Sequence, residues 1–343
     1  MGNDKIETPS ELIGFREEIA NIQTAIADFE SGRNLNVAII SEPYAGRTAI
    51  MNEIEKMILQ KVTRFSFSSI VKNKDEIILS GPSKRIVLID DCQFLYMRKI
   101  GGFDVLEYFL NLVSNPAILF ITTWNLYSWK YLDEVLNIGK FFPVQINLPK
   151  FTTYQIKESI LSGYKKDEII FVRDVEFEKE KIINFMKYPV SIKSWKKTIE
   201  LPYFKINYDF LKLRLLKKEE IIASEDIIFG KIHRVSNGNP GVAKIVWQRS
   251  LEYPTIKPSN VKDESFNIEL DYNEAFILNL ILSMKSITND DLSEIAGPDY
   301  QVGKIIFRLS KQGLISVEDA SCIIRPEALK SVIEFLKKLR LVW

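Results

Sequence analysis

The stretch NVAIISEPYAGRT, from Asn36 to Thr48, decides the fold class. Its first half is a short apolar run suited to a buried parallel strand, and its second half is a turn that leads into helical spacing. The turn follows the pattern G-x-x-x-x-G-K-[ST], with Ser41 at the first Gly, Gly46 at the second, Arg47 at the Lys and Thr48 at the hydroxyl. Two of the four defining positions depart from the pattern. The stretch therefore predicts a strand, a phosphate-loop-like turn and a helix, and leaves the activity open.

Each residue of this turn has a chemical consequence. In an intact loop, backbone N–H groups at the start of the helix point at phosphate oxygens, and Gly46 would permit that close approach. The hydroxyl of Thr48 can be a Mg²⁺ ligand. Arg47 keeps the positive charge, but its planar guanidinium does not simply replace a compact ammonium. Ser41 costs backbone freedom if a positive φ is needed there, and Pro43 would rigidify the loop.

Two more apolar runs end in polar side chains. RIVLIDD, Arg85 to Asp91, looks like a Walker B motif, in which Asp90 would hold Mg²⁺ through water and Asp91 would take the catalytic acidic position. The strand from Ala117 to Asn125 ends where a sensor of the γ-phosphate or of attacking water would lie, and Asn125 suits that role. A simpler interpretation is also open, because two Asp at a strand end can be a helix N-cap and Asn125 a turn former.

The chain alternates apolar strands with helices at a spacing that favours a parallel sheet covered on both faces. A capped amphipathic helix is expected at Thr8 to Ser31. The expected strands are Asn36 to Ile40, Arg64 to Ser68, Arg85 to Ile89, Ala117 to Thr123 and Val144 to Leu148. From Phe151 to about Arg249 the pattern turns mainly helical. The predicted division is an α/β core at 1–150, a helical lid at 151–251, a linker at 252–270 and a last unit at 271–343.

These motifs, with ELIGFREEI near the start and NGNPG before a helix, resemble the AAA+ superfamily of P-loop ATPases, in its initiator-like and archaeal STAND-type branches. The resemblance covers residues 8 to 250. It implies ATP and Mg²⁺ as cofactors and a homo- or hetero-oligomer. It implies a metal site at Thr48 and Asp90, and catalytic roles for Asp91 and Asn125. The nucleotide contacts that it implies are Gly14, Arg16, Pro43, Tyr44, Ala45, Gly46, Arg47, Thr48 and Asp90.

The chain departs from the family at two further positions. The lid Arg that senses nucleotide in many members has no counterpart in NGNPGVAK, where Lys244 is a poor substitute. The Arg finger that acts on a neighbouring subunit is replaced by Lys140, in GKFF. Together with Arg47, these changes leave ATP hydrolysis in question.

The last unit has three expected helices, Tyr272 to Ser283, Thr288 to Ile295 and Tyr300 to Gln312, followed by a strand pair in GLISVEDASCIIR. This order looks like a winged helix-turn-helix. Four polar or basic side chains share one side of the third helix and are candidates for duplex DNA contacts: Gln301, Lys304, Arg308 and Lys311. A solvated surface or a protein-docking face remains open, because Glu318 and Asp319 on the proposed wing would repel phosphate.

Composition excludes several classes of protein. The net charge is +1, so nucleic-acid binding must come from local patches. Only two cysteines, Cys92 and Cys322, and one histidine, His233, occur, which argues against a disulfide framework or a His-rich metal centre and favours a reducing, cytoplasmic setting. No membrane span is predicted. The basic and aromatic stretch from Lys193 to Lys218 fits either a lid core or a single-strand contact.

The sequence thus predicts an AAA+ ATPase-like protein that binds ATP, with weak or no hydrolysis, and acts as an assembly or regulatory module on DNA. Whether it is an enzyme stays open. The alternative is a catalytically inactive scaffold of the same fold that uses its winged helix for protein docking. A third possibility is a regulator in which nucleotide only locks a resting state.

Overall fold

The computed structural model describes residues 13–58, 62–77, 85–173, 183–192, 197–206, 224–263 and 266–342, with the backbone alone for 183–192 and 197–206. The chain divides into two compact units. The larger comprises Met1–Lys165, Ile232–Arg249 and Asp263–Trp343, and the smaller comprises Lys166–Lys231 and Ser250–Lys262. The larger unit carries all the site residues predicted from the sequence.

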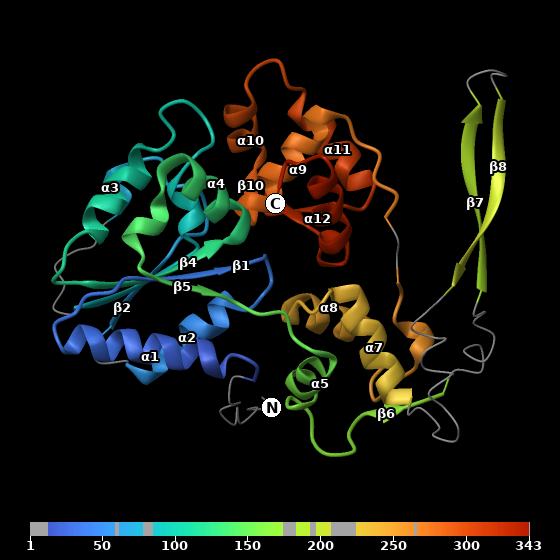
Figure 1. Cartoon of the computed structure of the whole chain (residues 1–343), viewed down its shortest axis with the longest axis horizontal. Coiled ribbons are helices and arrows are strands. Elements are labelled where there is room, and N and C mark those ends of the chain that lie inside the picture. The colour runs from blue at the N-terminus through green and yellow to red at the C-terminus, as the bar shows by residue number, and fades with distance from the viewer. Residues whose placement is uncertain are drawn as a thin grey trace, which may run out of the picture. The chain divides into compact units, whose positions relative to one another are not determined.

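A five-stranded parallel sheet forms the centre of the larger unit (Figure 1). Its strand order is β2-β3-β4-β1-β5, and every neighbouring pair is parallel. The strands are β1 Val37–Ser41, β2 Val62–Ser66, β3 Ile86–Asp90, β4 Leu119–Asn125 and β5 Val144–Asn147. Every residue of β1, β3 and β4 is buried, which explains why these strands read as continuous apolar runs rather than alternating ones.

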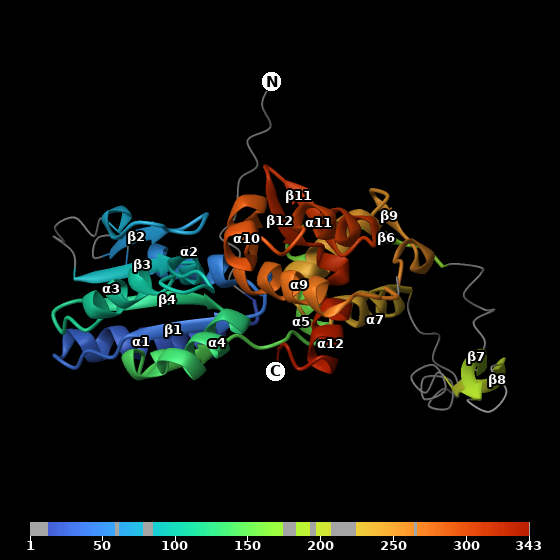
Figure 2. The same cartoon turned by 90° about the horizontal axis from the view of Figure 1, so that it is seen from above.

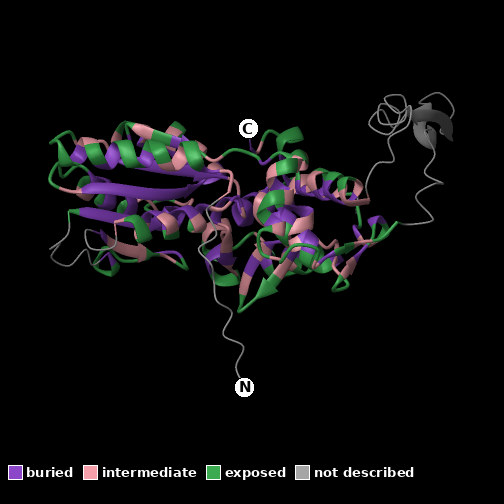
Figure 3. Cartoon of the chain, turned by 90° about the horizontal axis from the view of Figure 1, so that it is seen from below, coloured by how far each residue is buried: buried purple, intermediate pink, exposed green. Residues whose placement is uncertain are grey.

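Helices cover both faces of this sheet, α1 and α2 on one side and α3 and α4 on the other (Figure 1). Their bounds are α1 Arg16–Glu30, α2 Arg47–Met57, α3 Asp104–Val113 and α4 Leu126–Leu136. Seen from below, the buried strands lie between helices whose outer surfaces are exposed (Figure 3). Short 3-10 turns lie at η1 Lys74–Glu76, η2 Cys92–Leu95 and η3 Ile138–Phe141.

Two helices from the region predicted as a lid also belong to the larger unit. They are α5 Thr153–Leu161, which begins with a capping box formed by Thr152 and Gln155, and α8 Pro240–Ser250, which begins within NGNPG as predicted. A third helix, α7 Ser224–Ser236, has residues in both units.

The smaller unit contains more strand than the helical prediction for this region allowed. A short parallel pair joins β6 Ile170–Phe171 to β9 Thr255–Ile256, and the turn η5 Pro258–Asn260 follows. An antiparallel pair joins β7 Ile183–Ile192 to β8 Lys197–Ile206. The alternation of branched and aromatic residues in β8 accounts for the extended backbone. The basic and aromatic stretch 193–218 lies outside the described residues except for β8.

The C-terminal part of the larger unit has the order helix, strand, helix, helix, strand, strand, helix, and Figure 2 shows it from above. A three-stranded antiparallel sheet of order β10-β12-β11 accompanies the helices. The elements are α9 Tyr272–Met284, β10 Ser286–Thr288, α10 Asn289–Ala296, α11 Val302–Lys311, β11 Ile315–Glu318, β12 Ser321–Ile324, η6 Pro326–Ala328 and α12 Leu329–Lys338. This arrangement is consistent with a winged domain. The strand β10 was not predicted.

The predicted fold class is confirmed: a parallel α/β core of P-loop NTPase type with lid helices, followed by a unit that carries a small antiparallel sheet. Across the described part of the chain, no helix has both the length and the hydrophobicity needed to cross a bilayer.

Candidate functional site

The structure brings the three predicted motifs to one edge of the sheet. β4 lies between β1 and β3, so the carboxyl ends of these strands meet. Ser41 at the end of β1 is in register with Asn125 at the end of β4, and Asp90 ends β3. In open parallel sheets this edge is where ligands bind.

The turn between β1 and α2 has the backbone of a tight loop. Tyr44 has φ 65° and Gly46 has φ 99°, so both lie in the left-handed region. A Cβ on Gly46 would lie 3.1 Å from the ring of Phe15, which makes glycine the residue that fits. Pro43 and Ala45 are buried, whereas Thr48 is exposed.

The side chain of Arg47 turns into the protein and is only 5% exposed. Its Nη1 donates to the carbonyl oxygen of Ser41 at 2.8 Å and to that of Trp124 at 3.3 Å. Its Nη2 donates to Asp91 Oδ1 at 3.2 Å. The guanidinium therefore ties together the ends of β1 and β4 and the residue after β3.

Asp91 is the centre of a buried ion-pair network. It has φ 58° and is 4% exposed. Oδ1 accepts hydrogen bonds from Arg47 and from Gln93 Nε2 (2.9 Å), and Oδ2 accepts one from Lys285 Nζ at 2.5 Å. Burial alone would raise the pKa of Asp91, but the charges of Arg47 and Lys285 outweigh it and hold this pKa below its ordinary value.

Asp90 is engaged by a different set of donors. Its Oδ1 accepts from Thr123 Oγ1 at 2.5 Å and from the Asp91 N–H at 3.1 Å, and its Oδ2 lies 3.3 Å from Arg64 Nη2. Arg64 also pairs with Glu55 at 2.9 Å. Both oxygens of the predicted metal ligand are thus held by protein groups.

Asn125 is fully buried and holds two helices. Its Oδ1 accepts from the Tyr127 N–H at 3.0 Å, which caps the start of α4, and its Nδ2 donates to the Leu282 carbonyl of α9 at 2.8 Å. Its own N–H donates to Gln93 Oε1 at 3.1 Å. Its amide therefore acts as a cap and an anchor here.

The segment before α1, which includes the predicted nucleotide contact Gly14, is closed by aromatic side chains. Phe15 is 3% exposed, and its ring centroid lies 4.9 Å from that of Phe151. A Cβ on Gly14 would collide with the Phe151 ring. Arg16 is exposed at the first position of α1.

The NGNPG segment contacts the turn directly. Asn239 Nδ2 donates to the Pro43 carbonyl at 2.8 Å, and the Gly241 N–H donates to the Tyr44 carbonyl at 3.0 Å. A Cβ on Gly241 would strike that same oxygen, so a glycine is required for the approach. The NGNPG segment therefore packs against the turn, while Lys244 is exposed.

A Mg²⁺–ATP complex does not fit this arrangement of residues. The formal charges of the network balance, with three cations and three anions: Arg47, Arg64 and Lys285 against Glu55, Asp90 and Asp91. Each of these cations already faces a carboxylate, so a triphosphate would have to compete for them. Among the described residues, no group of three or more acidic, histidine or cysteine side chains is placed to hold a metal ion.

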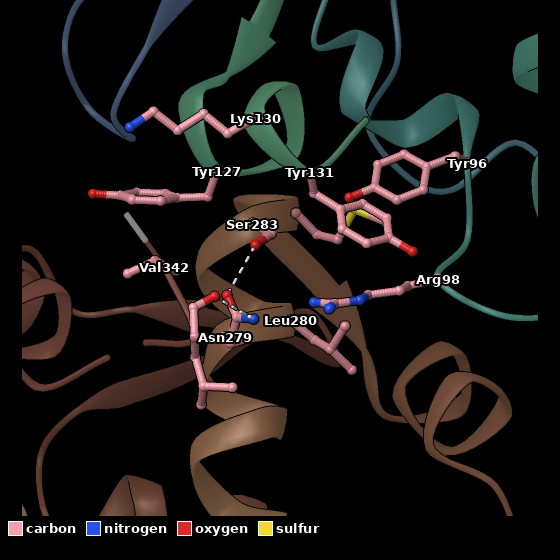
Figure 4. A pocket seen from close by; sticks show the side chains of 11 residues that line it. Tyr96, Arg98, Tyr127, Lys130, Tyr131, Asn279, Leu280, Ser283 and Val342 are labelled. Carbon is pink, nitrogen blue, oxygen red and sulfur yellow. Dashed lines mark hydrogen bonds between the residues drawn. The ribbon is translucent and has the colours of Figure 1, made fainter. Parts of the chain in front are cut away.

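A small cavity lies between α4 and α9 (Figure 4). Tyr127, Tyr131 and Lys130 line it from α4, Asn279 and Ser283 from α9, and Arg98 reaches in from the loop after η2. Its volume of about 30 Å³ corresponds to about one water molecule. It is a packing gap rather than a ligand pocket.

The candidate DNA residues lie on α11 or at its start. Gln301, Lys304 and Lys311 are exposed. Arg308 is also exposed, but its Nη1 lies 2.5 Å from Oε1 of the buried Glu274. Three of the four side chains therefore face solvent without an ion pair among the described residues, and Lys311 lies over the ring of Phe307.

Five residues of the site were not predicted: Glu55, Arg64, Gln93, Thr123 and Lys285. Thr123 and Gln93 are buried polar residues within two positions of a predicted motif, and that signal could have found them. Lys285 is 194 positions from Asp91 and carries no local signal.

Comparisons with known proteins give limited information. No protein-family model and no curated protein matches the chain. Similar solved structures include the Aeropyrum pernix ORC2 protein in its ADPNP–ADP complexes, 12% identical with a TM-score of 0.46 over 98% of this chain and 97% of that chain. Cdc6p from Pyrobaculum aerophilum is 14% identical with a TM-score of 0.46 over 98% and 97%. The Thermotoga maritima Holliday junction branch migration motor RuvB is 15% identical with a TM-score of 0.44 over 95% and 97%. Similarity this low assigns no function to the chain.

Proposed function

We propose that this chain is an AAA+-type assembly or regulatory module that does not hydrolyse ATP, and that its P-loop turn has a structural role. The observation that carries the proposal is the position of Arg47, which is 5% exposed and donates to the Ser41 and Trp124 carbonyls and to Asp91. The cation that would meet the phosphates is instead part of the core. Of the predicted functions, this favours the catalytically inactive scaffold.

The magnitudes support this choice. A hydrogen bond to a charged group contributes about 1.5–3 kcal/mol, and Arg47 would have to give up at least three of them to face a phosphate. A micromolar ATP complex has only about 8 kcal/mol of binding free energy in total. Breaking the Arg47 hydrogen bonds would cost most of that binding free energy, so ATP binding is expected to be weak.

ATP affinity and turnover test the proposal. We expect no affinity tighter than millimolar, with or without Mg²⁺, and no turnover above that of Asp91→Asn in the presence of duplex DNA. The matched variant Arg47→Lys restores the motif residue while Lys285 still holds Asp91, so it should also lack turnover. Turnover by the wild-type chain that disappears in Asp91→Asn would refute the proposal.

Contact with duplex DNA is a second candidate function, and the exposed Gln301 at the start of α11 and Lys304 and Lys311 on it favour this function. In a winged helix-turn-helix this helix would enter the major groove. If Lys304 and Lys311 each neutralise one phosphate, changing both to Gln should reduce the slope of log K against log salt by about 2. Changing Lys337 and Lys338 of α12 to Gln is the matched control. If the slope stays the same in the α11 variant, the DNA proposal fails and protein docking becomes the better explanation.

We include two further expectations in this proposal: an oligomer, which the resemblance to AAA+ proteins supports, and a reducing, cytoplasmic setting, which the low cysteine content supports. The free, buried thiols of Cys92 and Cys322 agree with a reducing compartment. Sedimentation of the full chain over a range of concentrations would test the oligomer.

A further inference from the structure

The strand β5 is an open edge of the central sheet. In the described part of the chain it pairs with β1 alone (Figure 1). The N–H groups of Val144 and Leu148 donate to carbonyls of the β1 segment at 3.2 and 3.0 Å. Because backbone polar groups alternate between the two sides of a strand, those of Gln145 and Asn147 point away from β1. Both residues are exposed, and no described residue bonds to these outward groups.

Two prolines limit this edge to a short stretch. Pro143 and Pro149 occupy the next outward-facing positions on either side of Gln145 and Asn147, and they have no N–H group to offer there. Proline and charge are the usual protections of an edge strand. Here the prolines close both ends, while the residues between them that face outward are uncharged. The edge can therefore accept a short extended segment without supporting open-ended pairing.

A cavity of about 300 Å³ opens beside the same edge, between α4 and β5. Its apolar wall consists of Ile40, Leu126 and Trp129, and Gln145 and Asn147 line it from the strand. Trp129 is 5% exposed and packs against two other aromatic rings, with centroids at 5.6 and 5.8 Å, so this wall is preformed. On an added strand, a side chain opposite Gln145 or Asn147 would lie on the same face of the sheet and reach over this cavity.

The charges at the cavity favour a cation. Asp133 and Glu134 line it from α4 together with Lys130, so two carboxylates and one ammonium give the lining a net charge of −1. Asp133 Oδ1 accepts the Gly139 N–H at 2.8 Å, and neither carboxylate forms an ion pair within the described residues. A Lys or Arg side chain could place its methylene groups on the apolar wall and its charge beside these carboxylates.

We propose that the β5 edge binds a short extended segment of a partner protein, which adds a strand beside Gln145 and Asn147 and inserts a Lys or Arg side chain into the cavity. In strand addition, main-chain hydrogen bonds give affinity, and pockets for alternate side chains give specificity. This goes beyond the proposed function, which names no partner for the α/β core.

A synthetic peptide tests the site in the full-length chain. The sequence acetyl-Thr-Val-Arg-Val-Thr-amide has the alternation of a strand and reads the same in both directions, so it can pair with β5 in either orientation. Two matched peptides have Glu in place of the Arg, or an N-methyl group on the Arg nitrogen that would face β5. Fluorescence anisotropy of each labelled peptide, titrated with the protein, gives its affinity.

We expect the Arg peptide to bind at least about tenfold more tightly than either matched peptide, since one charge-assisted hydrogen bond gives a factor of this size. Gln145→Pro removes an outward N–H and keeps the bonds to β1, so it should weaken binding to a similar extent. Gln145→Ala keeps that N–H and should bind like the wild type. Glu134→Lys should weaken binding of the Arg peptide and strengthen binding of the Glu peptide, and Glu107→Lys on the exposed side of α3 is the matched control.

Three results would overturn the proposal: no binding of the Arg peptide at millimolar concentration, equal affinities for the three peptides, or equal affinities of Gln145→Pro and Gln145→Ala. If Gln145→Pro fails to fold, the N-methylated peptide makes the same test on the wild-type chain. Self-association that Gln145→Pro removes, without peptide binding, would identify a second copy as the occupant and also overturn the proposal. ATP turnover and the salt dependence of DNA binding are assigned to other residues, so those proposals can fail separately.

Discussion

Replacing Asp91 by Asn should destabilise the larger unit by about 3 kcal/mol. The change keeps the size of the side chain but removes the charge that faces Arg47, which is 95% buried. Removing one member of a buried ion pair costs about 3–5 kcal/mol, because the remaining charge stays out of water. The lower end applies here, since Lys285 is 42% exposed and water can solvate it. The asparagine oxygen also keeps one acceptor for Gln93 or Arg47.

Glu294→Gln provides the matched control for this prediction. Glu294 also accepts from two lysines of the core, Lys72 and Lys99, but its side chain is 38% exposed. An exposed pair contributes about 1 kcal/mol or less. Calorimetry should therefore show the first unfolding transition about 6–12 °C lower in Asp91→Asn, and about 4 °C lower at most in Glu294→Gln. Equal shifts in the two variants would refute the buried network as a source of stability.

Three further predictions follow from the same structure. The pKa of Asp91 is lower in the folded chain than in the unfolded chain, where it is about 4, so the ionised carboxylate stabilises the fold at pH values above about 4. In urea titrations, the difference in unfolding free energy between wild type and Asp91→Asn should therefore shrink as the pH falls below about 4. Burial raises the pKa of the Cys92 and Cys322 thiols, so an aromatic disulfide reagent at pH 8 should react with neither until the chain is unfolded; rapid labelling of the native chain would contradict their burial. Gly46→Ala should cost about 1–3 kcal/mol, because φ 99° strains any L-residue and the new Cβ meets Phe15 at 3.1 Å; an unchanged Tm would show that the turn adopts another backbone.

The sequence predicted the sheet well because its strands are buried on both faces. The predicted strand Asn36 to Ile40 appears at Val37–Ser41, and Arg85 to Ile89 appears at Ile86–Asp90, each one residue late. In a buried parallel sheet the apolar run itself marks the strand, so little else is needed. The meeting of the P-loop turn, Asp91 and Asn125 followed from the same rule, since parallel strands end at one edge.

The chemistry at that edge could not be predicted in the same way. The replacement of Lys by Arg47 was visible, but whether its guanidinium faced a phosphate or the Trp124 carbonyl depended on side-chain packing. Another partner of Asp91 is Lys285, which follows a helix far along the chain, and only tertiary structure places it there. Local patterns predict which residues converge, but they do not predict which partner each buried charge takes.

The hydrogen bonds that support the two-residue turn Pro43–Tyr44 can form only late in the synthesis of the chain. Its carbonyl groups receive hydrogen bonds from Asn239 and Gly241, and the Tyr44 hydroxyl donates to the Ile324 carbonyl at 2.7 Å. These partners leave the ribosome about 200 and 280 residues later. Until then the turn in the nascent chain lacks these hydrogen bonds. A chain that stops before β12 would leave the Tyr44 hydroxyl without the Ile324 carbonyl as its acceptor.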